Sequence, residues 1–301
     1  MDTNAARRLR GCGLIALAAL FWALSGIVAK HLFTTRTIAP LVLVEFRMLI
    51  AFGILLLLLA ALAPSTLRIR LRDLPFFLVY GSLGMAMVQL TYFTAIREGS
   101  VSTAIFLQYL APLLTATYSV VWLRQPAPAG LGRHLALALG GSAMLLLGAG
   151  GLTTTPLGVL AGLASAGLLS FYAVYGARGV GMYSSHTVLL YALAVGTVSL
   201  WPLFTPWQVA SLGWGATDWL FAIYMAVFGT LVPFTLFLAG LRYVTPVQAT
   251  LTAMLEPVLA TVGAWLILGE ALSPWQIAGC CLIAVAVARL QLTRQAGAGA
   301  D

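Results

Sequence analysis

The stretch Met254–Trp265, MLEPVLATVGAW, places the carboxylate Glu256 directly before Pro257 inside a long apolar run. A carboxylate in apolar surroundings can bind a cationic ligand, carry a proton or lock a contact between helices. Pro257 has no N–H, so the carbonyl one turn earlier loses its helical partner. Gln248 and Thr252 precede Glu256 at helical spacing. This pattern predicts either a bent, polar cavity lining or a packing contact at Glu256.

The composition of the chain indicates whether water or lipid surrounds this carboxylate. Hydrophobic residues make up 61% of the 301-residue chain and charged residues only 8%, with a mean hydropathy of +1.00. A soluble domain carries about 25% charged residues, so this chain lacks the polar residues for a water-facing surface. Its apolar blocks are about twenty residues long, the length that a helix needs to cross a bilayer. The sequence therefore predicts an all-α integral membrane protein surrounded by lipid.

Turn signals divide the chain into ten apolar blocks, and we expect one membrane-spanning helix in each. Short segments rich in Pro, Gly, Ser and Thr connect them, which leaves no room for a soluble domain. The expected spans are 11–33, 40–63, 74–97, 101–123, 131–149, 156–178, 186–205, 217–241, 245–268 and 273–292.

Basic residues orient these spans, because cytoplasmic segments of membrane proteins are enriched in arginine and lysine. With a cytoplasmic N-terminus, the outer segments hold only Lys30, Arg36 and Arg97. Twelve arginines then lie inside: 7, 8, 10, 68, 70, 72, 124, 133, 178, 242, 289 and 294. Both termini are predicted to be cytoplasmic, and the net charge of +8 is a topology signal that does not indicate nucleic-acid binding.

The two halves of the chain resemble each other. Residues 92–125 align without a gap on 237–270, so that Pro112 matches Pro257. We divide the chain at residue 150 into five-helix repeats, 1–150 and 151–301 with a short basic tail. Because five is odd, the second repeat enters the membrane from the opposite side. Inverted repeats are typical of transporters, whose substrate binds where the halves meet.

The run 255–279, LEPVLATVGAWLILGEALSPWQIAG, resembles the signature of EamA-type members of the drug/metabolite transporter superfamily. The matching positions are Pro257, Gly269, Glu270, Gln276 and Gly279, and Arg47 matches an arginine typical of the second helix. The sequence departs from the pattern at FWALSG in the first block, and Gln125 stands where the second half has Glu270. Within the superfamily the chain is most similar to YddG-like amino-acid exporters. The resemblance implies outward transport of aromatic and other apolar amino acids.

Polar and aromatic side chains on several blocks are candidates for the substrate cavity, although packing or interfacial belts are alternatives for the aromatic ones. The candidates are Trp22, Lys30, Gln89, Tyr92, Gln108, Tyr172, Tyr175, Tyr224, Phe228 and Glu256, with Pro112 and Pro257 as gating hinges. Lys30 can also snorkel toward the outer surface. Arg47 lies deep in its block and needs a partner other than Glu45, which faces elsewhere. Ser273 is expected to cap the last helix.

Other function classes find less support in the sequence. The chain has no P-loop, HExxH or GxSxG motif, so we expect neither an ATP-driven pump nor an enzyme. Cys12, Cys280 and Cys281 lack metal-ligand spacing, and no metal or cofactor is expected. The prediction is a monomeric inner-membrane carrier of small amphipathic molecules that works by alternating access. Export of other metabolites or drugs with proton coupling is the alternative, followed by a channel.

Overall fold

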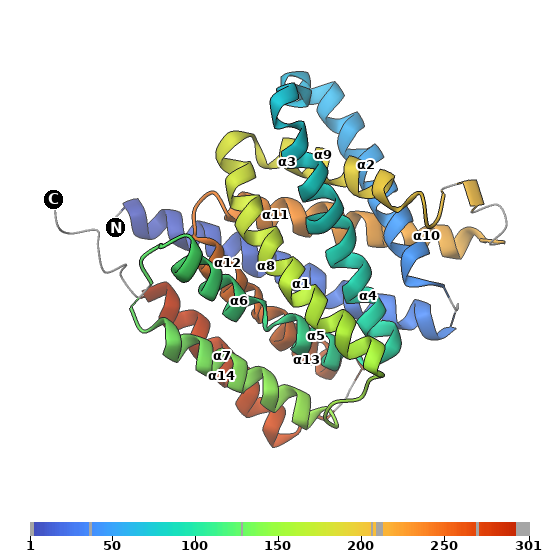
Figure 1. The fold of residues 1–301 in the computed structure, drawn as a ribbon. Coiled ribbons are helices and arrows are strands. Elements are labelled where there is room, and N and C mark those ends of the chain that lie inside the picture. The colour runs from blue at the N-terminus through green and yellow to red at the C-terminus, as the bar shows by residue number, and fades with distance from the viewer. Residues whose placement is uncertain are drawn as a thin grey trace.

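The computed structural model describes residues 3–35, 38–127, 129–205, 207–208, 213–268 and 271–292, and these residues fold almost entirely into helices (Figure 1). Six helices stand alone: α1 (Thr3–Thr35), α2 (Pro40–Leu62), α7 (Leu131–Gly148), α8 (Pro156–Met182), α9 (Ser185–Leu200) and α14 (Pro274–Leu292). Short 3-10 turns η1 (Pro64–Leu67) and η2 (Leu71–Asp73) follow α2.

The remaining helices form composite rods. Three of these contain a π-helical segment: α3 (Leu74–Val79) with η3 (Tyr80–Met87) and α4 (Val88–Glu98); α5 (Val101–Gln108) with α6 (Ala111–Thr117) and η4 (Tyr118–Trp122); and α10 (Ala216–Ala226) with η6 (Val227–Leu231) and α11 (Val232–Gly240). The fourth consists of α12 (Pro246–Ala253) and α13 (Leu255–Leu268). These helical segments follow the ten apolar blocks closely. The largest differences are in α1, which begins at Thr3 instead of residue 11, and in α9, which ends at Leu200 instead of residue 205.

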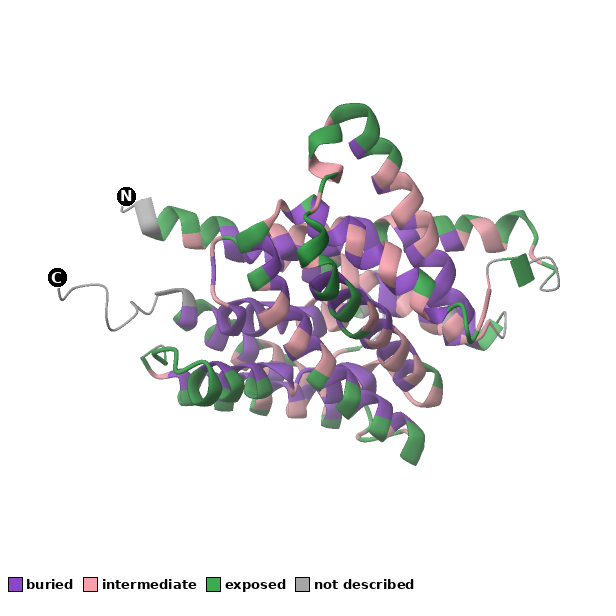
Figure 2. Cartoon of the chain, turned by 45° about the horizontal axis from the view of Figure 1, so that its top comes forward, coloured by how far each residue is buried: buried purple, intermediate pink, exposed green. Residues whose placement is uncertain are grey.

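By length and composition, seven helical segments are able to cross a membrane, and Ser185–Leu200 and Pro274–Leu290 are shorter apolar helices. The burial pattern suits lipid. Large apolar side chains such as Leu62, Trp122 and Leu160 are exposed, whereas Arg47 and Glu256 are buried. Figure 2 shows the exposed residues mostly at the outside of the bundle and the buried ones inside it. A membrane protein can expose apolar side chains to lipid in this way, because the solvent is itself apolar.

Close backbone approaches hold the bundle together. Helix α8 packs closely on α5 at a glycine, since a Cβ on Gly162 would lie 2.7 Å from the Leu107 side chain. At the crossing of α7 and α14, a Cβ on Gly141 would lie 2.7 Å from the carbonyl oxygen of Gly279. These two helices lie side by side, and the start of α1 and the end of α14 lie on the same side of the bundle (Figure 1).

Side chains cap the first turns of two helices, α12 and α14. Thr245 accepts from the Gln248 amide and Gln248 Oε1 accepts from the Thr245 amide, a capping box that begins α12. Ser273 and Gln276 exchange the same pair of bonds at the start of α14, so the predicted cap at Ser273 is confirmed. Gly269 and Glu270 lie outside the described residues.

Candidate functional site: a central cavity closed by tyrosines

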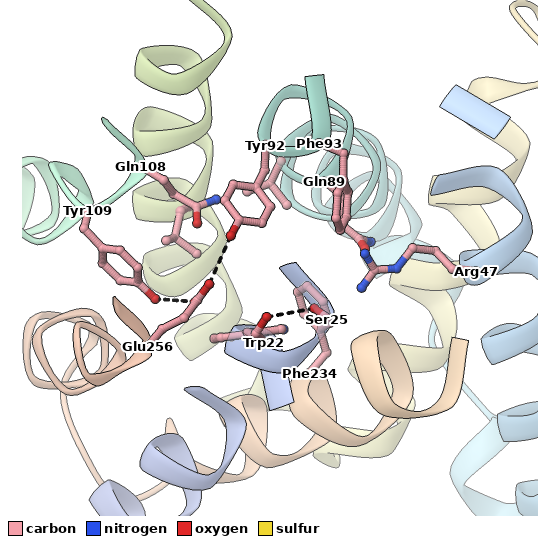
Figure 3. A pocket seen from close by; sticks show the side chains of 12 residues that line it. Trp22, Ser25, Arg47, Gln89, Tyr92, Phe93, Gln108, Tyr109, Phe234 and Glu256 are labelled. Carbon is pink, nitrogen blue, oxygen red and sulfur yellow. Dashed lines mark hydrogen bonds between the residues drawn. The ribbon is translucent and has the colours of Figure 1, made fainter. Parts of the chain in front are cut away.

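A small cavity lies in the middle of the bundle, and we call it the central cavity (Figure 3). Its volume is about 40 Å³, which is room for only a few water molecules. The chain is therefore in a closed conformation around this point. Helices of both halves contribute the lining: Trp22, Ser25, Arg47, Val88, Gln89, Tyr92, Phe93, Gln108, Tyr109, Leu169, Phe234 and Glu256.

Glu256 is 2% exposed and is held by two tyrosines from the first half of the chain. Tyr92 Oη donates to Glu256 Oε1 at 3.1 Å, and Tyr109 Oη donates to Oε2 at 2.7 Å (Figure 3). We call these three residues the tyrosine clasp. Hydrogen bonds to a charged acceptor are stronger than neutral ones, so the clasp ties α4 and the end of α5 to α13.

Two helix breaks set the positions of the clasp. The first falls at Tyr109 and Leu110, between α5 and α6, and the second falls at Met254, between α12 and α13. Tyr109 and Met254 are separated by 145 positions, the same offset that relates Pro112 to Pro257. Each break comes just before its proline because the missing N–H and the ring interrupt the helical ladder. The breaks bring Tyr109 and Glu256 to the centre of the bundle.

Arg47 enters the cavity from α2 and is bonded to the second half of the chain. Its Nε donates to Thr230 Oγ1 at 2.6 Å, and its Nη2 donates to the carbonyl oxygen of Gly229. That carbonyl has no amide partner one turn later, because the residue there is Pro233. The guanidinium also lies over the ring of Phe93, 4.7 Å from its centroid. Arg47 thus finds a partner other than Glu45, as the sequence predicts.

The neighbouring carboxylate Glu45 is separately bonded. Trp201 Nε1 donates to Glu45 Oε1 at 3.1 Å, on the far side of α2 from Arg47. Two amide side chains of the lining donate hydrogen bonds within or between helices. Gln108 donates to Ser165 Oγ on α8 at 2.6 Å, and Gln89 Nε2 donates to the carbonyl oxygen of Met85 at 3.3 Å.

A larger cavity of about 610 Å³ adjoins the central one, and we call it the vestibule. Lys30 lies in its wall and donates to the carbonyl oxygens of Ile96 and Gly99 at the end of α4. Glu256 lines the central cavity and the next residue, Pro257, lines the vestibule, so the first turn of α13 is part of the wall between them. The vestibule is lined by Ile27, Lys30, Thr34, Val101, Ser102, Ile105, Ser142, Leu145, Leu146, Gly148, Ala149, Pro257, Ala260, Thr261, Ala271, Leu272 and Gln276.

The structure brings half of the ten cavity candidates together. Trp22, Gln89, Tyr92, Gln108 and Glu256 line the central cavity, and Lys30 lines the vestibule. Of the two hinge candidates, Pro112 is buried in the first turn of α6 beside the first break, and Pro257 follows the second.

The other four candidates, Tyr172, Tyr175, Tyr224 and Phe228, line neither of the two cavities. Tyr172 is fully buried and stacks on Tyr80 with ring centroids 5.1 Å apart, and Tyr175 stacks on Phe76 at 4.8 Å. Tyr80 is itself fully buried. Aromatic packing occupies these rings.

On the other side of the bundle, Tyr224 packs against Phe228, whose side chain is 43% exposed on the outer surface. The predicted polar stripe also needs correction. Gln248 is buried but its side chain caps α12, and Thr252 donates to the carbonyl of Gln248 at 2.7 Å, so of the three only Glu256 lines the central cavity.

Several lining residues were not among the candidates, notably Ser25, Arg47, Tyr109, Phe93 and Phe234. A signal existed for two of them. Arg47 is an ionisable residue deep in an apolar block, which is a functional position by default in a membrane. Tyr109 lies three residues before Pro112, where a helix break was to be expected. Among the described residues, no group of three or more His, Cys, Asp or Glu side chains is placed to hold a metal ion.

Comparison with known proteins identifies the family to which the chain is similar. A family model described as the EamA-like transporter family matches residues 9–147 and again residues 156–290. The chain is 26% identical over 263 residues to an uncharacterized inner membrane transporter, YicL, of Salmonella typhimurium, covering 85% of this chain and 86% of that protein. It is 30% identical over 199 residues to an uncharacterized transporter of Archaeoglobus fulgidus, covering 65% and 69%.

A solved crystal structure has a similar fold. It superposes with a TM-score of 0.73 at 23% sequence identity and covers 95% of this chain and 96% of its own. At this identity the likeness concerns the fold alone.

Proposed function

Because the chain belongs to the EamA-like transporter family, we propose that it is a secondary transporter that exports small amphipathic metabolites, above all aromatic and other apolar amino acids, by alternating access. The chain is a multi-pass protein of the inner membrane. Its family membership fixes the transporter class, while the substrate and the mechanism are our proposals.

The observation that carries this proposal is the pairing of a closed central cavity with an adjoining vestibule. Alternating access needs a central site that is sealed from one side while a path leads to it from the other. The tyrosine clasp lines the central cavity and joins residues from the two halves of the chain, and its Glu256 directly precedes Pro257 in the wall of the vestibule. Breaking its two hydrogen bonds is the event that lets the central cavity widen.

We further propose that the two halves, 1–150 and 151–301, are inverted five-helix repeats with both termini in the cytoplasm. Two observations support this arrangement. The family model matches each half in turn, and the helix breaks recur with the 145-residue offset of the sequence repeat. In this topology Lys30 lies near the outer end of α1, so the vestibule opens to the outside. Pro112 and Pro257 then act as hinges where the two interrupted rods bend.

The aromatic side chains around the cavity support an amphipathic substrate. Trp22 lies against Phe234 and Phe237 with ring centroids 5.2 and 5.5 Å apart, and Phe93 lies beneath Arg47. A pocket with apolar walls and a few fixed polar groups suits a small molecule that has one charged end.

Proton-coupled export of other metabolites or drugs is a second candidate, and Glu256 is the observation that favours it. The described residues give this carboxylate only neutral partners, so it is free to take up a proton when the tyrosines move away. A proton gradient then drives the cycle.

Purified protein in proteoliposomes tests both candidates. Uptake of a labelled panel of aromatic, aliphatic and charged amino acids is measured with and without a pH gradient. Saturable flux of aromatic and aliphatic amino acids, with counter-exchange, is expected. Non-saturable flux without counter-exchange indicates a channel, and flux of none of the panel contradicts the amino-acid proposal.

A further inference from the structure

Two polar atoms in the wall of the central cavity are buried and have no hydrogen-bond partner in the described part of the chain. They are Nη1 of Arg47, a donor, and Oε1 of Gln89, an acceptor. The two side chains are 2% and 4% exposed. Buried polar atoms are normally bonded, so an unmatched donor and an unmatched acceptor in one cavity call for a ligand.

The two atoms belong to one corner of the cavity. The Arg47 guanidinium lies over the ring of Phe93, and Gln89 is one helical turn before Phe93 on α4. Figure 3 shows Gln89 and Arg47 on one side of the cavity and Glu256 on the other. The polar corner formed by Arg47 and Gln89, which we call the head-group corner, is therefore distinct from the tyrosine clasp.

The charge of Arg47 is not balanced by a carboxylate. Glu45 is bonded to Trp201 and Glu256 to the two tyrosines, and Arg47 forms no ion pair with a described residue. Thr230 and Gly229 hold two nitrogens of the guanidinium in place, and Nη1 is left without a partner among the described residues. Fixing an uncompensated cation inside a membrane protein is costly, and such residues mark ligand pathways.

We propose that the head-group corner binds the charged end of an α-amino acid, with the carboxylate on Arg47 Nη1 and an ammonium N–H on Gln89 Oε1. This inference rests on the proposed export of amino acids and assigns the residues that recognise them. A carboxylate oxygen is the strongest acceptor for a guanidinium N–H, and an amide oxygen suits an ammonium group. The rings of Trp22, Phe93 and Phe234 then face the apolar side chain.

The present volume of the cavity fits this assignment. About 40 Å³ holds water but not an aromatic amino acid, so the ligand enters only when the clasp opens and the cavity widens. Arg47 is bonded to η6 and not to the clasp, so its guanidinium stays in place when the tyrosines move.

Ligands that differ in one charged group provide the test. The purified chain in detergent is titrated with L-phenylalanine, with 3-phenylpropionate, which lacks the amine, and with phenethylamine, which lacks the carboxylate. For the wild type we expect affinity to fall in that order. Arg47→Gln is expected to lose about tenfold or more for both carboxylates and to leave phenethylamine nearly unchanged. Gln89→Met is expected to weaken L-phenylalanine while 3-phenylpropionate is unaffected.

Thr230→Val is the matched control, because it removes a partner of Arg47 but leaves the charge in the cavity. It should lower the melting temperature without changing the order of the three ligands. Arg47→Lys keeps the charge and replaces Arg47→Gln in the test if that variant does not fold. We expect Arg47→Lys to bind the carboxylate ligands more weakly than the wild type and to keep the preference for carboxylates. Selectivity ratios are insensitive to the folded fraction.

Three outcomes overturn the assignment: binding of none of the ligands to the wild type, equal losses of all three in Arg47→Gln, or no loss at all. These outcomes are separable from failure of the transport proposal. Carboxylate selectivity that depends on Arg47, together with no amino-acid flux in proteoliposomes, contradicts the proposed function alone. Amino-acid flux with selectivity that is independent of Arg47 contradicts the head-group corner alone.

Discussion

Tyr109 and Glu256 join the two helix breaks of the bundle. The Tyr109 hydroxyl, in the break before Pro112, donates to the Glu256 carboxylate at 2.7 Å, and Glu256 directly precedes Pro257. Because the same hydrogen bond links both interrupted rods, we expect motion at one break to be coupled to motion at the other.

Removing a clasp hydroxyl should loosen the closed conformation. In Tyr109→Phe and Tyr92→Phe one hydrogen bond to a buried carboxylate is lost, which costs about 1.5–3 kcal/mol. We expect a lower melting temperature and a central cavity that opens more readily. Solvent access is measured by the reaction of a cysteine placed at Leu169 with a membrane-impermeant thiol reagent, in a background with the native cysteines removed. Tyr224→Phe, outside both cavities, is the control and should leave labelling unchanged.

Substitutions of Glu256 separate the role of its charge from the role of its hydrogen bonds to the two tyrosines. Glu256→Gln keeps the shape and one acceptor oxygen, whereas Glu256→Ala leaves both tyrosine hydroxyls unpaired. We expect Ala to lower the melting temperature more than Gln, and both to reduce transport by about tenfold or more if the charge serves coupling. Near-normal transport by Glu256→Gln, together with a severe loss of transport and stability in Glu256→Ala, would show that Glu256 serves helix packing. A stable and fully active Glu256→Ala protein contradicts both roles.

The hinge residues are tested by restoring the helical ladder. Pro112→Ala and Pro257→Ala regain the missing amide and straighten the rods, so the proteins should fold and transport more slowly. Initial rates in proteoliposomes measure the effect. Pro40→Ala, at the first turn of α2 where no ladder bond is missing, is the matched control. Wild-type turnover in both hinge variants shows that the breaks are passive.

Topology is tested by reporter fusions along the chain. Fusions after residues 36, 99, 152 and 213 should report an outside location, and fusions after 70, 128, 182 and 243 an inside one. The alternation follows from ten spans with a cytoplasmic N-terminus. One reproducible reversal in the second half ends the case for inverted repeats.

The crossing of α7 and α14 gives a stability test that is independent of transport. Gly141→Ala would place a Cβ 2.7 Å from the Gly279 carbonyl oxygen, so the two helices must separate and the melting temperature should fall by several degrees. Gly140→Ala meets nothing within 4 Å and gains helix propensity, so its melting temperature should be unchanged or higher. Equal melting temperatures for the two variants contradict this packing.

The sequence by itself determined the helical segments and the helix breaks. Both follow from local chemistry, because an apolar block of about twenty residues forms a helix in lipid and a proline interrupts the ladder within four residues. The separate orientation of Glu45 and Arg47 is local too, since residues two apart on a helix face different ways.

Only the tertiary structure decided which side chains meet in the cavity. The clasp joins residues 147 positions apart in sequence, and Arg47 reaches Thr230 across 183. The π-helical segments η3 and η6 add to the difficulty, because their wider turns rotate the faces that a regular helix predicts. The surroundings of Tyr172 and Tyr175 depend on tertiary structure for another reason. An aromatic ring on a helix face fits a packed interface as well as a cavity wall, and only the neighbouring helices distinguish the two.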